Sequence, residues 1–150
     1  NDEELTLPHP PLVVYYRPDT VHLLPNPSEF VLRDTKSAED FVAAVQELDE
    51  HDATHGVTRK FYVFTPIKTP GRPQTHDTID QAVALLEKWC EARAATRIIN
   101  GNTLLSDLQG HPRARYFRGD GINLNEHGYL RLAVLLQQQL EADQPNEPQA

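Results

Sequence analysis

The chain has 150 residues with 22 acidic and 14 basic side chains, a formal net charge of −8 and 39% hydrophobic residues, which fits one globular domain. The negative charge argues against a general nucleic-acid or acidic-membrane binder, because phosphate binding needs clustered cations. The apolar runs are too short to span a bilayer, and the single cysteine, Cys90, cannot form an internal disulfide. We therefore expect a cytoplasmic or otherwise intracellular protein in which Cys90 is a buried, unreactive thiol.

Composition divides the chain into three parts. Residues 1–10 are acidic and then proline-rich, which predicts a loose lead-in, and residues 11–140 carry the apolar patterns of a folded domain. Residues 141–150 are polar with two prolines, which predicts a disordered tail.

The first half of the folded part contains two predicted strands and one helix. Residues 12–16 (Leu-Val-Val-Tyr-Tyr) form a short β-branched and aromatic run, typical of a strand buried on both faces. Ser37 is placed as an N-cap before apolar residues at helical spacing, which predicts a helix over 38–50. Residues 61–64 (Phe-Tyr-Val-Phe) are the second buried strand, stopped by Thr65-Pro66.

The second half alternates in the same way. Asp77 or Thr78 begins a helix that runs to Cys90, residues 96–99 form a third strand, and residues 103–108 form a short helical turn. The last helix is capped by Asn125, with one predicted apolar face made of Tyr129, Leu132, Ala133, Leu136 and Leu140.

Strands alternating with helices predict an α/β fold with a mainly parallel sheet. Three strands make a thin sheet for a chain of this length. Three alternatives stay open: an edge strand lies in the N-terminal segment, sequence outside this chain completes the sheet, or another chain completes it.

The segment from Asp120 to Tyr129 (Asp-Gly-Ile-Asn-Leu-Asn-Glu-His-Gly-Tyr) resembles the closing motif of the SGNH (GDSL-type) hydrolase family. That motif typically runs Asp-Gly-Ile/Val-His, followed by Gly-Tyr and an amphipathic helix. Here Asn123 stands in place of the histidine. The resemblance covers about residues 11–140 and implies a flavodoxin-like three-layer sandwich, without the N-terminal strands of the full SGNH fold.

Other positions of the family pattern also differ. Laid on the family's Gly-x-Asn-Asp loop, residues 12–24 place Pro18 at the glycine, Thr20 at the oxyanion asparagine and Val21 at the aspartate. The Gly-Asp-Ser block that carries the nucleophile is absent, as is the block that supplies an oxyanion glycine. The resemblance therefore implies that Asp120, Asn123 and Thr20 are vestigial catalytic positions.

Hydrolytic chemistry needs a nucleophile and a base with a pKa near neutrality. The three serines, Ser28, Ser37 and Ser106, are read as loop or capping residues, because none lies at a strand-to-helix elbow. Asn123 cannot accept a proton, so Asp120 is expected to hold the tight turn.

The histidines do not restore this chemistry. His127 is read as a surface residue unless a shifted register brings it into the site. His51 and His55 are expected in a loop and lack a third ligand, so we expect no metal and no cofactor.

A basic segment precedes the closing motif. Its candidate binding residues are His111, Arg113, Arg115 and Arg118, and Tyr116 and Phe117 lie among them. One interpretation is a solvated loop whose two aromatic side chains join the core. The other is a site for RNA or an acidic partner, which Arg93 and Arg97 could extend. The insect Oskar protein, whose SGNH-like domain lacks the catalytic residues and binds RNA, provides an analogy.

These features favour a catalytically inactive SGNH-like domain that acts as a protein-interaction or dimerisation module, with RNA binding as a second expectation and no membrane partner. One alternative is a GDSL-type esterase, acting on ester or acetyl groups, whose nucleophile block lies outside this chain. Another is an unrelated parallel α/β domain whose match to the motif arose by chance.

Overall fold

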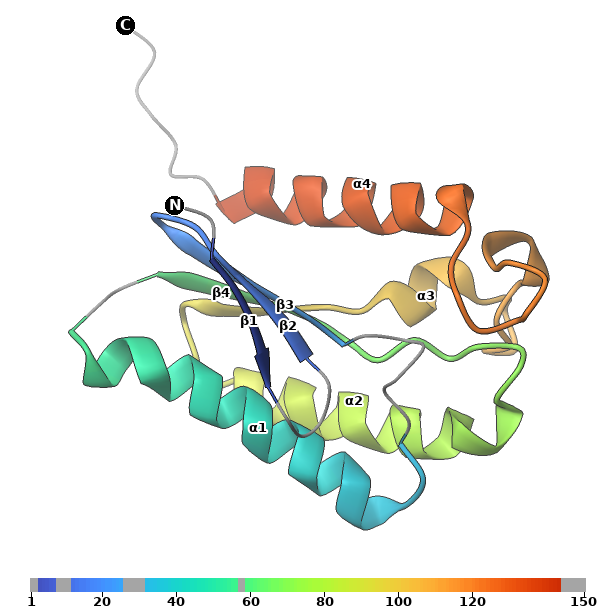
Figure 1. Cartoon of the computed structure of the whole chain (residues 1–150), viewed down its shortest axis with the longest axis horizontal. Helices are drawn as coiled ribbons and strands as arrows, with labels where there is room; N and C mark the ends of the chain where they lie inside the picture. The colour runs from blue at the N-terminus through green and yellow to red at the C-terminus, as the bar shows by residue number, and fades with distance from the viewer. Residues whose placement is uncertain (1–2, 8–11, 26–31, 57–58, 144–150) are drawn as a thin grey trace, which may run out of the picture.

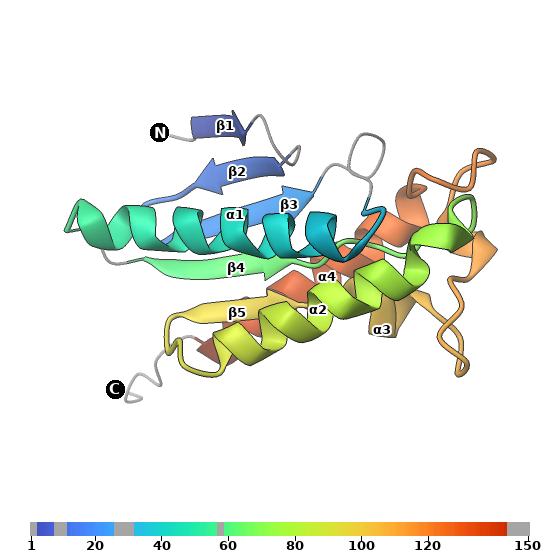
Figure 2. The same cartoon turned by 90° about the horizontal axis from the view of Figure 1, so that it is seen from below.

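The computed structural model describes residues 3–7, 12–25, 32–56 and 59–143. Helices α1 (Thr35–Thr54) and α2 (His76–Cys90) cover one face of a five-stranded sheet, and α4 (Glu126–Asp143) lies on the other face (Figures 1 and 2). A short helix, α3 (Gly101–Leu105), follows the last strand. This arrangement confirms the predicted three-layer α/β fold.

The strands lie side by side in the order in which they occur along the chain. The last three are parallel and are joined by α1 and α2, as parallel strands require, whereas the first three pair antiparallel. Their bounds are β1 Glu3–Leu7, β2 Leu12–Tyr16, β3 Thr20–Pro25, β4 Lys60–Phe64 and β5 Thr96–Ile99.

Two of these strands, β1 and β3, were not predicted. The expectation that residues 1–10 form a loose lead-in is wrong for β1, which pairs with β2 from Glu3↔Tyr16 to Leu7↔Leu12. The alternation Leu5-Thr6-Leu7 suits a strand, and the outer edge of β2 offers unpaired backbone groups to it. The thin sheet is thus extended from within the chain, by the first of the three alternatives.

The helix ends also differ from the predictions. Helix α1 begins before Ser37, because Asp34 is its cap: Asp34 Oδ1 accepts the Ser37 N–H at 2.9 Å, and Ser37 Oγ accepts the Asp34 N–H at 3.0 Å. This reciprocal pair is a capping box.

Helix α1 also includes His51, which was expected in a loop. Helix α2 begins at His76, and α3 covers 101–105 where a turn over 103–108 was expected.

The core has two parts because side chains alternate across the sheet. Phe61 and Val63 of β4 face α1 and α2, whereas Tyr62 and Phe64 face α4. The predicted apolar face of α4 is wrong in two positions: Tyr129 and Ala133 are exposed, and the buried line runs through Gly128 and Leu132. Partly buried Leu135, Leu136 and Leu140 continue that line.

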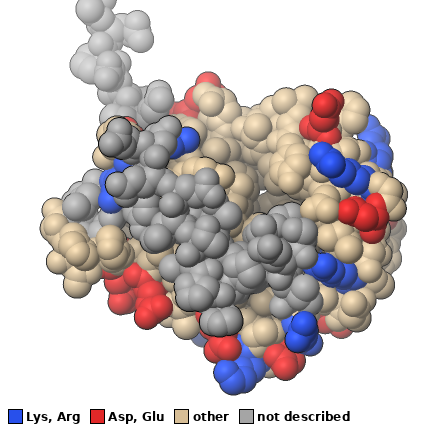
Figure 3. All heavy atoms as spheres, viewed as in Figure 1, with Lys and Arg blue, Asp and Glu red and all other residues tan. Residues whose placement is uncertain are grey.

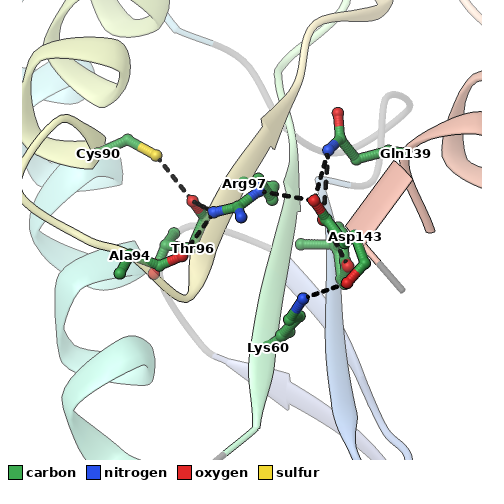
Figure 4. Close-up of polar contacts among 8 residues, drawn as sticks. Lys60, Cys90, Ala94, Thr96, Arg97, Gln139 and Asp143 are labelled. Atoms are coloured by element: carbon green, nitrogen blue, oxygen red, sulfur yellow. Dashed lines mark hydrogen bonds and ion pairs between the residues drawn. The ribbon is translucent and has the colours of Figure 1, made fainter. Parts of the chain in front are cut away.

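The C-terminal end of α4 is fixed by the carboxylate of Asp143 (Figure 4). It accepts hydrogen bonds from Tyr62 Oη at 2.8 Å and Arg97 Nε at 3.1 Å, and the Asp143 carbonyl accepts one from Lys60 Nζ at 2.7 Å. The helix therefore continues through 141–143, where the tail was expected to begin, and residues 144–150 lie outside the described chain.

The protonation states of this cluster follow from the same contacts. Burial alone would raise the pKa of Asp143, but hydrogen bonds from Tyr62, Gln139 and Arg97 outweigh it and lower that pKa. Burial, followed by the hydrogen bond to Asp143, raises the pKa of Tyr62 to about 12. Asp143 is thus an anion and Tyr62 a donor at neutral pH.

Replacing Asp143 with Asn should lower the free energy of unfolding by about 2 kcal/mol at neutral pH, since it removes the anion from a largely buried ion pair. The folded-state pKa of Asp143 lies below its ordinary value of 3.8, so the contribution is present above pH 3.8 and is lost as the pH falls through the folded-state pKa. Urea denaturation of both proteins across a pH series measures this difference.

Asp40→Asn is the matched control. Asp40 pairs with Lys36 at 3.1 Å, but their side chains are 62% and 81% exposed, so the change should stay within about 0.5 kcal/mol. Equal effects of the two substitutions would contradict the role given to Asp143.

Candidate functional site

The closing motif lies at the carboxyl ends of the parallel strands. The loop that follows β4 donates a hydrogen bond from Gly71 N to Gly121 O at 2.8 Å. A side chain at Gly71 would lie 3.0 Å from the carbonyl oxygens of Asp120 and Gly121, so this contact is close. In open α/β sheets, ligands usually bind beyond this edge.

Asp120 organises the turn through three hydrogen bonds. Its Oδ1 accepts the N–H groups of Ile122 at 2.9 Å and Asn123 at 3.0 Å, and its Oδ2 accepts Asn123 Nδ2 at 2.7 Å. The backbone bond from Ile122, followed by the two from Asn123, lowers the pKa of Asp120. The expected turn-holding role is confirmed. The Asn123 amide donates to this carboxylate but cannot take up a proton.

Thr20 is not part of this site. It begins β3 and pairs with Lys60, the first residue of β4, so it lies at the amino end of the parallel strands. Assigning Thr20 to the Gly-x-Asn-Asp loop is therefore wrong, as are the matching assignments of Pro18 and Val21. The carboxyl end of β3 is Pro25, and the following sequence, Asn26-Pro27-Ser28, lies outside the described residues.

The neighbouring strand does not direct a nucleophile to Asp120. Because β2 is antiparallel to β3, its carboxyl end at Tyr16 lies at the opposite edge of the sheet. Of the serines, Ser37 belongs to the capping box of α1, and Ser28 is outside the described residues. Ser106 Oγ is buried, with no hydrogen-bond partner in the described part of the chain.

The structure also places three histidines and the cysteine that the sequence raised as candidates. His127 is exposed in the first turn of α4, as expected. The rings of His51 and His55 lie 4.4 Å apart between centroids, and within the described ranges no three His, Cys, Asp or Glu residues gather to hold a metal. Cys90 is half-buried and donates from Sγ to Thr96 O at 3.0 Å; burial raises its pKa, which disfavours the reactive thiolate.

The basic segment surrounds a buried aromatic pair. Tyr116 and Phe117 are 7% and 6% exposed, so the interpretation that they join the core is confirmed. The neighbouring polar side chains are exposed: His111, Arg113, Arg115 and Arg118. Most of these residues lie in or beside a short 3-10 helix, η2 (Ala114–Tyr116).

Arg131 was missed from the sequence because it lies on α4, beyond the closing motif. Its guanidinium carbon is 6.0 Å from the centroid of the Tyr116 ring, and that of Arg115 is 5.3 Å away. Arg93 and Arg97 do not extend this group, contrary to expectation. They flank the amino end of β5, where Arg93 pairs with Asp49 at 3.2 Å and Arg97 with Asp143.

No protein-family model and no curated protein matches the chain. A solved structure reported as "a putative platelet activating factor" from Streptococcus pneumonia is similar to it, with a TM-score of 0.60 and 16% sequence identity. The match covers 81% of this chain and 59% of that chain, so this chain spans less than two thirds of its neighbour's length. The likeness supports the α/β fold. No described helix is long and apolar enough to cross a membrane.

Replacing Gly128 with Ala should destabilise the site by displacing the closing motif. A methyl group there would lie 2.5 Å from the Tyr116 carbonyl oxygen and 2.7 Å from Leu124 Cδ2. Because the nearer atom belongs to the backbone, the overpacking cost should lie in the upper part of its usual range of about 1–3 kcal/mol, above the gain in helix propensity of about 1 kcal/mol. Denaturant unfolding measures the net loss.

Gly119→Ala is the control. Beyond the adjacent residues, no described atom lies within 4 Å of the added methyl group, so the change should be within about 0.5 kcal/mol. A Gly128→Ala protein at least as stable as the wild type would contradict the close packing of α4 against η2.

Proposed function

We propose that this chain is a catalytically inactive SGNH-like domain that acts as an interaction module. The observation that carries the proposal is the hydrogen bond from the Asn123 amide to Asp120. The Asn123 side chain lies at the position where the SGNH family has a histidine, whose imidazole is oriented by the aspartate. The turn keeps its structure, but the group that would exchange a proton with substrate is absent.

The direction of β2 supports the same proposal. A parallel strand beside β3 would end next to the closing motif, whereas β2 ends at the far edge of the sheet. Two independent features, one side chain and one strand direction, thus disfavour hydrolysis at this edge.

Within this proposal, binding to a protein partner or self-association ranks ahead of RNA binding. The net charge is −8, and acidic and basic side chains are interspersed on the face seen in Figure 3. RNA binding normally requires clustered cations and accessible aromatic rings, but Tyr116 and Phe117 are buried.

An ester substrate such as p-nitrophenyl acetate tests the lack of activity. We expect no turnover above the blank for the wild type. Asn123→His should also give none, because restoring the base supplies no nucleophile. The absorbance of released p-nitrophenolate measures turnover by both proteins, and the Asp120→Ala variant is the matched control.

Turnover by the wild type that is lost in Asp120→Ala would overturn the proposal. It would favour the alternative, a GDSL-type esterase acting on ester or acetyl groups. Turnover that Asp120→Ala leaves unchanged would indicate a contaminating activity or a reaction remote from this motif.

A further inference from the structure

We infer that the outer side of η2 and α4 binds an acidic protein segment that also carries apolar side chains, an inference that rests on the proposed interaction function. This η2–α4 surface consists of Arg115, Leu130, Arg131 and Val134. Arg113 and Arg118 flank it in the chain.

The η2–α4 surface is continuous. Arg115 and Arg131 both lie over the ring of Tyr116, which joins η2 to α4. Leu130 and Val134 are one helical turn apart beside Arg131, and they are 62% and 46% exposed. Leu132, on the inner side of the same helix, is 8% exposed. Helix α4 thus has apolar residues on two opposite sides, a pattern typical of a helix covered on both.

The guanidinium groups at this surface have donors to spare. No ion pair to Arg113, Arg115, Arg118 or Arg131 forms within the described ranges, whereas Arg93 and Arg97 are paired. Asp107 and Asp120 interact electrostatically with Arg113 and Arg118 without forming an ion pair, and Oδ1 of each carboxylate already accepts two backbone N–H groups. Glu126, exposed at the start of α4, offsets part of the positive charge. The carboxylates of a partner would accept hydrogen bonds from these guanidinium groups and pair with their charge.

The surface suits a protein better than RNA. Its exposed apolar groups, Leu130 and Val134, are aliphatic, and aliphatic contacts with arginine anchors are typical of protein interfaces. Single-stranded RNA uses aromatic platforms in a strongly positive groove. Tyr129 offers one half-exposed ring, and the nearby carboxylates weaken the positive field.

A second copy of this chain is a poorer occupant. A twofold contact through the η2–α4 surface would bring it against the same surface of the partner, because isologous interfaces are self-complementary. Both copies would then bring the positive charges of Arg115 and Arg131 into one interface, and the repulsion would oppose the contact of the leucine and valine side chains. An acidic segment of a different chain has no such conflict.

The test uses a fluorescein-labelled helical peptide of about 18 residues, or five turns, made of Glu and Leu with leucines at positions i, i+3 and i+4. Fluorescence anisotropy of the full chain should show saturable binding that weakens as salt rises. A Glu/Ser peptide of equal charge and a Lys/Leu peptide should bind at least about tenfold more weakly. A single-stranded poly(U) RNA is the fourth probe.

Variants locate the site. Arg115→Glu with Arg131→Glu should weaken binding of the Glu/Leu peptide by at least about tenfold, and Leu130→Gln with Val134→Gln by about fivefold or more. Leu108→Gln and Lys88→Glu are matched controls. Leu108 is 98% exposed in the turn between α3 and η2, outside the η2–α4 surface, and Lys88 is exposed on α2. Both variants should bind like the wild type. Thermal melts confirm that each variant is folded.

Each outcome decides the inference. Selective binding of the Glu/Leu peptide, lost in the two double variants alone, supports it. Binding of poly(U) in place of the peptide overturns it in favour of RNA, and equal binding by every variant overturns the location. Failure of all four probes also overturns it. The absence of ester turnover would still support the inactive domain, so the two failures are distinguishable.

Discussion

The contact between the Asp143 carboxylate and the sheet fixes the helix on which both the closing motif and the η2–α4 surface depend. A negative charge at the last turn of a helix opposes the helix dipole, so Asp143 is stable there only with compensating donors. Tyr62 and Arg97 bind the carboxylate, and Lys60 binds the carbonyl of the same residue. These contacts join α4 to β4 and β5 and set which side of α4 faces the core.

The other end of α4 is fixed by packing and capping. Asn125 Oδ1 accepts the Gly128 N–H at 3.0 Å, which confirms the predicted cap. Its Nδ2 donates to Arg115 O at 2.7 Å, so one side chain joins the helix to η2. The absence of a side chain at Gly128 lets the helix approach the Tyr116 carbonyl. With both ends held, the outer side of α4 stays exposed on a rigid support.

Local sequence patterns predicted the elements that depend on local properties. Continuous β-branched and aromatic runs placed β2, β4 and β5, and an amide side chain before a helical pattern placed the cap at Asn125. Strand β3 was missed because His22 interrupts its apolar run and its parallel partner, β4, lies far along the chain. The misplacement of Thr20 followed from this omission. The rotation of α4, which exposes Tyr129, depends on tertiary contacts at both of its ends, those of Gly128 with η2 and those of Asp143 with the sheet, and has no local signal.

In the proposed SGNH-like domain, the asparagine at position 123 separates the requirements of folding from those of catalysis. The folded turn needs a donor that reaches the Asp120 carboxylate, and an amide provides it at 2.7 Å. Catalysis needs a group that binds and releases a proton near neutrality, which an amide does not do. The turn at Asp120 therefore forms with an amide at position 123, without any group there that titrates near neutrality. An intact turn at Asp120 and an amide at position 123 are therefore compatible. The arginine and aliphatic side chains of the η2–α4 surface are exposed, so packing of the core does not explain them.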